Sequence, residues 1–184
     1  WYDWDWAGAE RDFRRGLELN PNDALGRNWH AGYLSLQGRH DEAIAEQQRA
    51  RDLDPLSLIV NTNLTRALYW ARRYDEAIAQ ARRTLDLDPA FSLALYWLEG
   101  ALRHKGLLEE AVALRQSVAT PEQAQEGALL FQHGGFRALL RESGERHKNS
   151  GMLETAAREY AQAGEVDEAI ALLAACAERH CSNV

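Results

Sequence analysis

The C-terminal residues Cys176, His180 and Cys181 are the first candidates for chemistry, because cysteine and histidine are the usual zinc ligands in proteins. On a helix, Cys176 and His180 would share one face, whereas Cys181 would be rotated by about 100° from His180. No second pair of ligands lies nearby in the sequence. The pattern therefore favours packing of Cys176 in a core and predicts no metal site.

No spacing typical of catalysis occurs elsewhere. The sequence contains no GxSxG, HExxH or CxxC motif and no glycine-rich phosphate loop. The acidic runs DEA and EEA recur once per repeat, which favours helix-start electrostatics over a metal or acid–base site. The histidines are scattered, with no two of them four residues apart: His30, His40, His104, His133, His147 and His180. We therefore expect no catalytic residue, no cofactor and no enzymatic activity.

Composition narrows the classes of partner. The 184 residues are 46% hydrophobic and 27% charged, which is enough apolar material for a sizeable core. A net charge of −7 disfavours direct nucleic-acid contact, which depends on Lys and Arg. No stretch approaches the roughly 18 apolar residues of a membrane span, and two cysteines are consistent with a reducing compartment. The sequence predicts a cytoplasmic protein with no membrane partner.

The helices that would position functional side chains follow from an internal repeat. Pro21, Pro55 and Pro89 lie 34 residues apart (55 − 21 and 89 − 55). The same interval relates DEAIA at Asp41, DEAIA at Asp75 and EEAVA at Glu109, whereas DEAIA at Asp167 is out of phase. A period of this length is typical of helical repeat proteins.

Each period predicts an antiparallel pair of helices. Proline cannot continue a helix but suits the first turn of the next one, so Pro55 and Pro89 mark junctions. Gly38 and Gly106 can take the left-handed conformation that ends a helix. Small alanines recur where two helices would approach closely, at Ala43, Ala77 and Ala111.

This pattern resembles the tetratricopeptide repeat over roughly residues 5–118. In that family a small residue, a bulky residue, a second small residue and a proline recur through the second helix. Here Ala9, Phe13, Gly16 and Pro21 match all four places, whereas Gln47 stands where a bulky ring is usual in the next unit. The resemblance implies an all-α fold of about eleven helices, a right-handed superhelix (α-solenoid) of antiparallel helix pairs.

The resemblance also implies a single array over residues 1–184. We expect a second helix of a truncated repeat at 5–21 and regular repeats at 22–55, 56–89 and 90–120. An irregular pair, divided at Gly134 and Gly135, would follow at 121–149. A last repeat at 150–184 would contain helices Met152–Ala163 and Val166–His180, separated at Gly164.

In this family the first helix of each pair lines the concave side of the superhelix. Arginines and aromatics are enriched in binding hot spots, so we regard Arg66, Tyr69, Trp70, Tyr96 and Arg103 as the sharpest hypothesis for a partner-binding groove. Packing between helix pairs is the alternative for the three rings. Alignment of the units places the following residues near the concave side: Asn28, Ser35, Thr62, Arg66, Tyr69, Trp70, Leu93, Tyr96, Arg103 and His104.

The sequence also resembles the repeat region of large bacterial regulators, in which the repeats follow a winged-helix, adenylate cyclase or serine/threonine kinase domain. We therefore expect a non-catalytic scaffold that binds a protein or peptide, or its own upstream effector domain, through the groove. A homodimer formed through the open ends of the array is one alternative, and a small-molecule sensor or enzyme is another. The chaperone-binding clamp of the family is not supported, because only Asn63 has the expected residue type.

The aromatic start, WYDWDWAGAE, fits the same register. Asp5 is predicted to cap the helix that follows, and Trp6 to pack in the first core between helices. The chain begins at Trp1 rather than Met, and we interpret it as a fragment in which the preceding first helix is mostly missing. Trp1 or Trp4 is expected to fold back on the helix or to be covered by a neighbouring molecule, because an exposed tryptophan ring is unfavourable.

Overall fold

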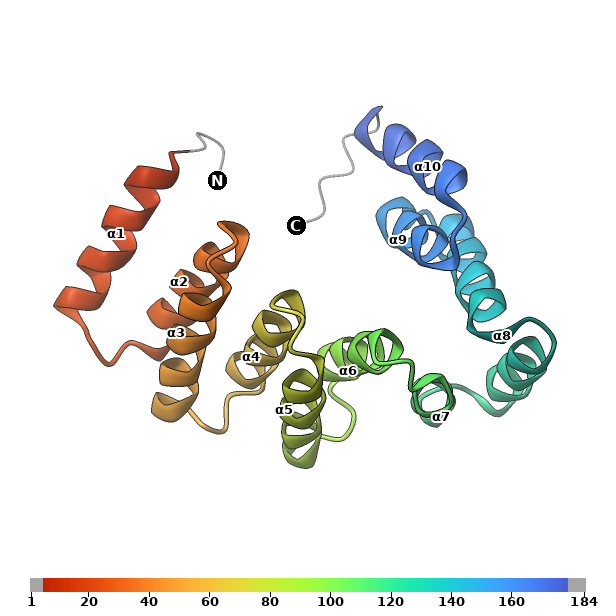
Figure 1. Cartoon of the computed structure of the whole chain (residues 1–184), viewed down its shortest axis with the longest axis horizontal. Coiled ribbons are helices and arrows are strands. Elements are labelled where there is room, and N and C mark those ends of the chain that lie inside the picture. The colour runs from red at the N-terminus through yellow and green to blue at the C-terminus, as the bar shows by residue number, and fades with distance from the viewer. Residues whose placement is uncertain (1–4, 179–184) are drawn as a thin grey trace. The chain divides into compact units, whose positions relative to one another are not determined.

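The first residues of the N-terminal helices recur at intervals of 34 residues in the computed structural model, which describes residues 5–178 (Figure 1). The first helices of successive pairs are α2 (Ala24–Leu36), α4 (Leu58–Trp70) and α6 (Ser92–His104). The second helices are α1 (Trp6–Leu19), α3 (His40–Leu53), α5 (Tyr74–Leu87) and α7 (Leu108–Ser117). Helix α2 packs on α3 and α4 on α5, and successive first helices also contact one another. The described residues form an all-α solenoid without any strand, as predicted.

The chain divides into two compact units, Trp1–Ala111 and Val112–Val184. The second unit contains α8 (Pro121–Asn149), α9 (Leu153–Ala163) and α10 (Val166–Glu178), and α7 runs across the division. Its core is formed where α9 packs on both α8 and α10. Tyr160, Ala169 and Cys176 are buried there, so Cys176 is a core residue as predicted.

Helix starts follow the expected capping chemistry. Asp5 accepts a hydrogen bond from the backbone N–H of Gly8 at 2.8 Å, and Asp23 accepts one from Gly26 at 3.0 Å. These bonds satisfy donors that have no partner within the first turn of a helix. The cap at Asp5 is confirmed, and Trp6 packs against the core of α2 and α3. The predictions for Trp1 and Trp4 lie outside the described residues.

One sequence-based detail is corrected. Pro55 and Pro89 do not lie in the first turn of the next helix: Pro55 lies in the turn after α3, and Leu58 is the first residue of α4. Helix α8 breaks at Gly135 (φ 63°, ψ −162°), at the predicted division of this helix pair. The described residues form ten helices, and because α8 consists of two helical segments, this agrees with the expected number of about eleven.

The turns between first and second helices share one backbone geometry. Gly38 and Gly106 have φ values of 72° and 76°, and Arg72, at the same place in the repeat, has a φ of 59°. At all three positions the N–H bonds to the carbonyl three residues earlier, Arg72 to Tyr69 at 3.0 Å. A side chain with a Cβ in this left-handed region costs about 1–2 kcal/mol. Arg72 therefore holds a strained conformation that glycine adopts at the other two turns.

We expect Arg72→Gly to raise the free energy of unfolding by about 0.5–1 kcal/mol, because relief of strain exceeds the added entropy of the unfolded chain. Urea denaturation followed by circular dichroism measures the change. Gly38→Ala is the control and should lower stability by about 1 kcal/mol. A lower denaturation midpoint for Arg72→Gly would contradict the strain at position 72.

The close approach of paired helices rests on fully buried alanines. Ala43, Ala77 and Ala111 are all 0% exposed, as their recurrence predicted. Buried amides hold the same interfaces: Gln47 donates to Asn28 Oδ1 at 2.7 Å, and Gln80 donates to Asn61 Oδ1 at 2.9 Å. Buried polar groups are tolerated because they are paired in this way.

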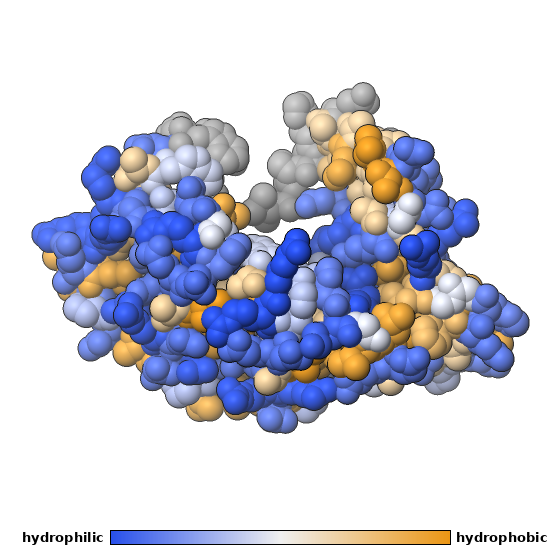
Figure 2. Space-filling model, viewed as in Figure 1, coloured by the Kyte–Doolittle hydropathy of each residue, from blue (hydrophilic) through white to orange (hydrophobic). Residues whose placement is uncertain are grey.

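An apolar stripe is exposed on α10. Val166, Ile170 and Leu173 lie on one face of the helix and are 52–60% exposed. Figure 2 shows apolar residues gathered over this helix, whereas hydrophilic residues dominate the remaining surface in view. Within the described part of the chain, no helix combines the length and apolar character that crossing a membrane requires.

Candidate functional site

A cluster of aromatic side chains lies on the first helices of unit Trp1–Ala111. Its rings come from the C-terminal end of α4, the start of α5, and the middle and C-terminal end of α6. We call it the aromatic cluster, and its members are Tyr69, Trp70, Tyr74, Tyr96, Trp97 and His104. Helices α4 and α6 contact each other directly, so the repeat stacks the two ring-bearing segments side by side.

Tyr69 is the centre of the cluster. Its ring lies 5.2 Å from Trp97 and 5.4 Å from His104, both in edge-on geometry, and its hydroxyl is 3.0 Å from His104 Nε2. Gly100 allows this approach, because a Cβ there would lie 3.2 Å from the Tyr69 ring. Edge-on aromatic pairs add about 0.5–1.5 kcal/mol each beyond area burial. The ring positions are therefore fixed before any ligand arrives.

Two indole rings shape the rest of the cluster. Trp70 and Trp97 stand perpendicular to each other at 6.1 Å, and Tyr96 packs edge-on to Trp97 at 5.1 Å. Tyr96 is 42% exposed, while Trp70 and Trp97 are half-buried. The cluster therefore offers partly accessible apolar ring surface.

Arg66 lies over this surface without a carboxylate partner. Its guanidinium carbon is 5.1 Å from the centre of the Trp70 ring. The side chain is half-buried and, among the described residues, forms no ion pair. Burial lowers the pKa of Arg66, with no carboxylate counteracting it. A half-buried cation of this kind is stabilised when an anion approaches, because its water has already been partly removed.

The charge beside the cluster is otherwise balanced or positive. Arg103 lies 3.6 Å from Glu99, and both side chains are largely buried. Burial lowers the pKa of His104, and the charges of Arg103 and Arg72 lower it further, so His104 is neutral at pH 7. The surroundings of Arg66 thus favour a negatively charged ligand.

The structure separates the predicted groove residues into two sets. Asn28, Ser35 and Thr62 are buried, with exposures of 3%, 7% and 0%, so their side chains do not reach the surface. Asn28 instead accepts internal hydrogen bonds from Gln47 and Asn63, both at 2.7 Å. Accessible or half-buried side chains near the aromatic cluster are the second set: Arg66, Tyr69, Trp70, Leu93, Tyr96, Arg103 and His104. Partner binding by either set stays a prediction.

Sequence reasoning missed two members of the cluster. Trp97 lies one position after Tyr96 and was not included among the groove residues, although its ring contacts three cluster members. Tyr74 begins a second helix, yet its ring stacks on His104 at 4.8 Å. The signal available was the density of rings at the end of one helix and the start of the next, in LYWARRY.

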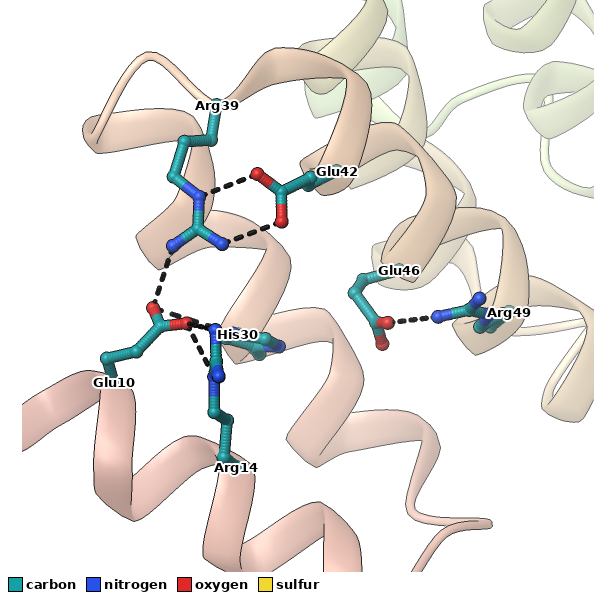
Figure 3. A network of polar contacts seen from close by, with 7 residues as sticks. All are labelled: Glu10, Arg14, His30, Arg39, Glu42, Glu46 and Arg49. Carbon is teal, nitrogen blue, oxygen red and sulfur yellow. Dashed lines mark hydrogen bonds and ion pairs between the residues drawn. The ribbon is translucent and has the colours of Figure 1, made fainter.

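A separate charged network joins α1, α2 and α3 (Figure 3). Glu10 accepts hydrogen bonds from Arg14 at 2.8 Å and from Arg39 at 3.0 Å, and Arg39 also donates to both oxygens of Glu42. Burial raises the pKa of Glu10, but these bonds outweigh burial and hold the pKa below its usual value. The network ties the first described helix to the next pair.

His30 lies beside this network in an apolar site. It is 8% exposed, its ring stacks on Phe13 at 5.4 Å, and neither ring nitrogen has a hydrogen-bond partner. Glu10 lies 4.0 Å from Nε2 and would attract a protonated ring. Burial nevertheless has the larger effect and lowers the pKa of His30. The folded chain therefore favours the neutral imidazole.

We expect stability to fall as the pH drops below the ordinary histidine pKa of 6.5. The unfolded state binds a proton there that folded His30 does not, so the free energy of unfolding decreases with decreasing pH. Urea midpoints measured from pH 7 to pH 5 should decline less steeply in His30→Leu than in wild type. Equal slopes would show that burial of His30 does not govern the pH dependence in this range.

The sequence predicts no metal site. Among residues 5–178, no group of three or more His, Cys, Asp or Glu side chains is placed to hold a metal ion. His180 and Cys181 lie outside the described residues, so the expectation of no metal there stays a prediction.

A family profile described as the tetratricopeptide repeat matches residues 1–57 and 63–125. No curated protein sequence matches the chain. Several solved structures have a similar fold. MamA is 22% identical, with 91% of each chain covered and a TM-score of 0.55. TTC0263, a thermophilic TPR protein in Thermus thermophilus, is 18% identical, covers 92% of this chain and 90% of its own, and has a TM-score of 0.58.

YrrB, described as a TPR protein with an unusual peptide-binding site, is another similar structure. It is 22% identical, covers 84% of this chain and 74% of its own, and has a TM-score of 0.52. At these identities the likeness establishes the fold alone.

Proposed function

The chain belongs to the tetratricopeptide repeat family, and on that premise we propose that it is a non-catalytic interaction module that binds a peptide segment at the aromatic cluster. The segment carries an acidic group, either a side chain or a C-terminal carboxylate, beside an apolar or aromatic residue. The acidic group pairs with Arg66, and the apolar residue packs on Trp70, Trp97 and Tyr96.

The observation that carries this proposal is Arg66. Many other arginines of this unit pair with carboxylates, as Arg27 does with Glu46 at 2.6 Å, whereas Arg66 lies half-buried against a ring and forms no ion pair with any described residue. A charge-assisted hydrogen bond contributes about 1.5–3 kcal/mol. The rings add contact area at little conformational cost, because they already hold one another in place.

The peptide-binding site in the description of YrrB supports a peptide as the class of ligand. The partner is a separate protein or an effector domain of the same polypeptide, and the module acts as a scaffold in a cytoplasmic bacterial signalling or transcription regulator. Nucleic acid is not the ligand, because a net charge of −7 repels a phosphate backbone.

Fluorescence anisotropy with labelled decapeptides tests the proposal. The set pairs one Trp, Phe or Leu with one Asp or Glu at varied spacing, ends in either a carboxylate or an amide, and includes matched peptides with Gln or Lys in place of the acid. Acidic peptides should bind best, and Arg66→Ala should weaken them about tenfold to a hundredfold.

Arg83→Ala is the matched control, because Arg83 is exposed on α5 away from the rings. Arg83→Ala should leave the affinity for acidic peptides unchanged. Arg66→Lys should retain part of the affinity, since lysine keeps the positive charge but lacks the planar guanidinium that binds a carboxylate with two hydrogen bonds. Equal binding of acidic and Gln peptides, or full binding by Arg66→Ala, would reject the proposal.

Self-association is the second candidate, and the exposed stripe of α10 favours it. Val166, Ile170 and Leu173 form an apolar face that, within the described residues, no helix covers. Light scattering over a concentration series should then detect a dimer that Ile170→Glu abolishes. A mass that stays monomeric at high concentration would remove this candidate.

A further inference from the structure

Two turns of the N-terminal unit expose large apolar side chains. The turn from α3 to α4 carries Leu53, Leu56 and Ile59, which are 41%, 73% and 47% exposed. The turn from α5 to α6 carries Leu87 and Leu93, which are 45% and 39% exposed. In Figure 1 both turns lie along the lower side of this unit. We call the surface that these five residues form the turn edge.

The exposure of the turn edge is not an effect of a chain end. The α3–α4 turn has described helices on both sides, because α2 packs on α3, and α4 packs on α5 and α6. Leu53 and Ile59 have apolar counterparts exactly one repeat later, at Leu87 and Leu93 (87 − 53 and 93 − 59 are both 34). Single exposed leucines are ordinary on a protein surface, whereas apolar residues gathered on one surface mark an interaction site.

The turn edge is also acidic. Asp54, Asp86 and Asp88 lie beside the exposed leucines, and none of the three forms an ion pair with a described residue. Residues 52–65 and 86–102 contain no Lys, Arg or His. Apolar surface bordered by unpaired carboxylates is complementary to a partner that is both apolar and cationic.

Basic residues lie at the opposite edge of the unit. The turns between first and second helices carry Arg39, Arg73 and Lys105. Arg51, the last cation before the α3–α4 turn, is already paired with Asp52 at 2.9 Å. The unit therefore separates charge between its two edges, and its field attracts a cationic partner to the turn edge.

The spacing of the exposed residues matches the geometry of a helix. Leu53 and Leu87 end second helices, and Ile59 and Leu93 are the second residues of first helices, so they form two rows. Helices α4 and α6 contact each other, and packed helices lie about 8–10 Å apart. Seven residues of an α-helix advance by about 10.5 Å. A helix along the turn edge therefore presents residues i and i+7 to one row, and residues i+3 and i+10 to the other.

We propose that the turn edge binds an amphipathic helix of a partner protein, with apolar residues at i, i+3, i+7 and i+10 and with Lys or Arg on both flanks. The apolar residues pack on the two rows, and the cations pair with Asp54 and Asp86. This is recognition of a helix through its apolar face. It uses no residue of the aromatic cluster and a ligand of opposite charge, so it is independent of peptide binding there.

A designed helix provides the probe. It has about 18 residues, which is long enough to be partly helical in water, with Leu at i, i+3, i+7 and i+10, Lys at the flanking positions and Ala elsewhere. Fluorescence anisotropy should detect saturable binding of this Lys–Leu peptide to the full chain. A peptide of the same composition in scrambled order lacks the apolar face, and a peptide with Glu in place of Lys is repelled by the aspartates. Both should bind at least tenfold more weakly.

Paired substitutions test the apolar contact. Leu56→Gln together with Ile59→Gln removes exposed apolar side chains, so circular dichroism should show unchanged helix content, and binding of the Lys–Leu peptide should weaken at least tenfold. The matched control makes the same change at Leu36 and Leu107, which are exposed at the opposite edge, and it should leave the affinity unchanged.

Charge reversal tests the ionic contact. Asp54→Lys together with Asp86→Lys should weaken binding of the Lys–Leu peptide at least tenfold and strengthen binding of the peptide with Glu. The same reversal at Asp12 and Asp41, which are exposed outside the turn edge, changes the net charge equally. It should change the affinity by less than about threefold, because salt screens distant charges.

Equal binding of the ordered and scrambled peptides would overturn the proposal. So would equal effects of the two charge reversals, or full affinity in the variant with Leu56→Gln and Ile59→Gln. A homodimer detected by light scattering that this variant disrupts would identify a second copy as the occupant, and would likewise contradict a partner helix.

Discussion

Ala77→Leu is expected to lower the free energy of unfolding of the N-terminal unit by about 3 kcal/mol. Ala77 is 0% exposed on α5, at the place where all the regular pairs carry alanine. Leucine would force the helices apart or into unfavourable rotamers, and overpacking of this kind costs typically about 1–3 kcal/mol or more. Because α5 contacts both α4 and α6, the displacement would disturb two interfaces.

Urea denaturation measures this effect, and Ala79→Leu is its matched control. Ala79 is exposed on the same helix, so the same change of side chain should alter stability by less than about 0.5 kcal/mol. Similar midpoints for the two variants would mean that position 77 tolerates bulk, and that close helix approach does not depend on it.

Leu34→Ala should have an effect of similar size, a loss of about 3 kcal/mol. Leu34 is 1% exposed on α2 and belongs to the cluster against which Trp6 and Phe13 of α1 pack. Truncation removes apolar contacts and leaves a cavity that a well-packed core closes only in part, which costs about 2–5 kcal/mol. Because α1 packs on α2 and on the core to which Leu34 belongs, its attachment should weaken most.

Leu36→Ala is the matched control, because it makes the same change of side chain at an exposed position of the same helix. Leu36 lies two residues further along the same helix and is 51% exposed, so its truncation should cost less than about 0.5 kcal/mol. Amide hydrogen exchange in Leu34→Ala should accelerate in α1 more than in α4. Unchanged exchange in α1 would show that Leu34 does not anchor this helix.

The helices could be predicted from the sequence because the repeat places breakers at fixed intervals. Gly38 and Gly106 end the first helices as expected. The same register requires a left-handed residue at position 72, but an arginine there gives no sign of that requirement. The hydrogen bond from Arg73 N–H to the Leu68 carbonyl, at 2.9 Å, shows that the turn geometry is imposed by the repeat even without glycine.

The candidate site was harder to predict, because a repeat register places residues on a helix without fixing the direction of each side chain. One residue along a helix turns the side chain by about 100°. Thr62 and Asn63 illustrate the consequence: the first is fully buried, and the second is half-buried and bonds to Asn28. Residue type helped more than register, since Arg66, Tyr69 and Trp70 reach accessible or half-buried positions.

The contacts of the N-terminal unit join only helices that are adjacent or next but one in the chain. Every contact therefore closes a short loop, and folding can start at any helix pair and spread to its neighbours. Such a topology has low contact order, which favours rapid folding. It also makes the array modular: duplication or deletion of a 34-residue block would leave the remaining interfaces intact, so the number of repeats can change in evolution without a new core.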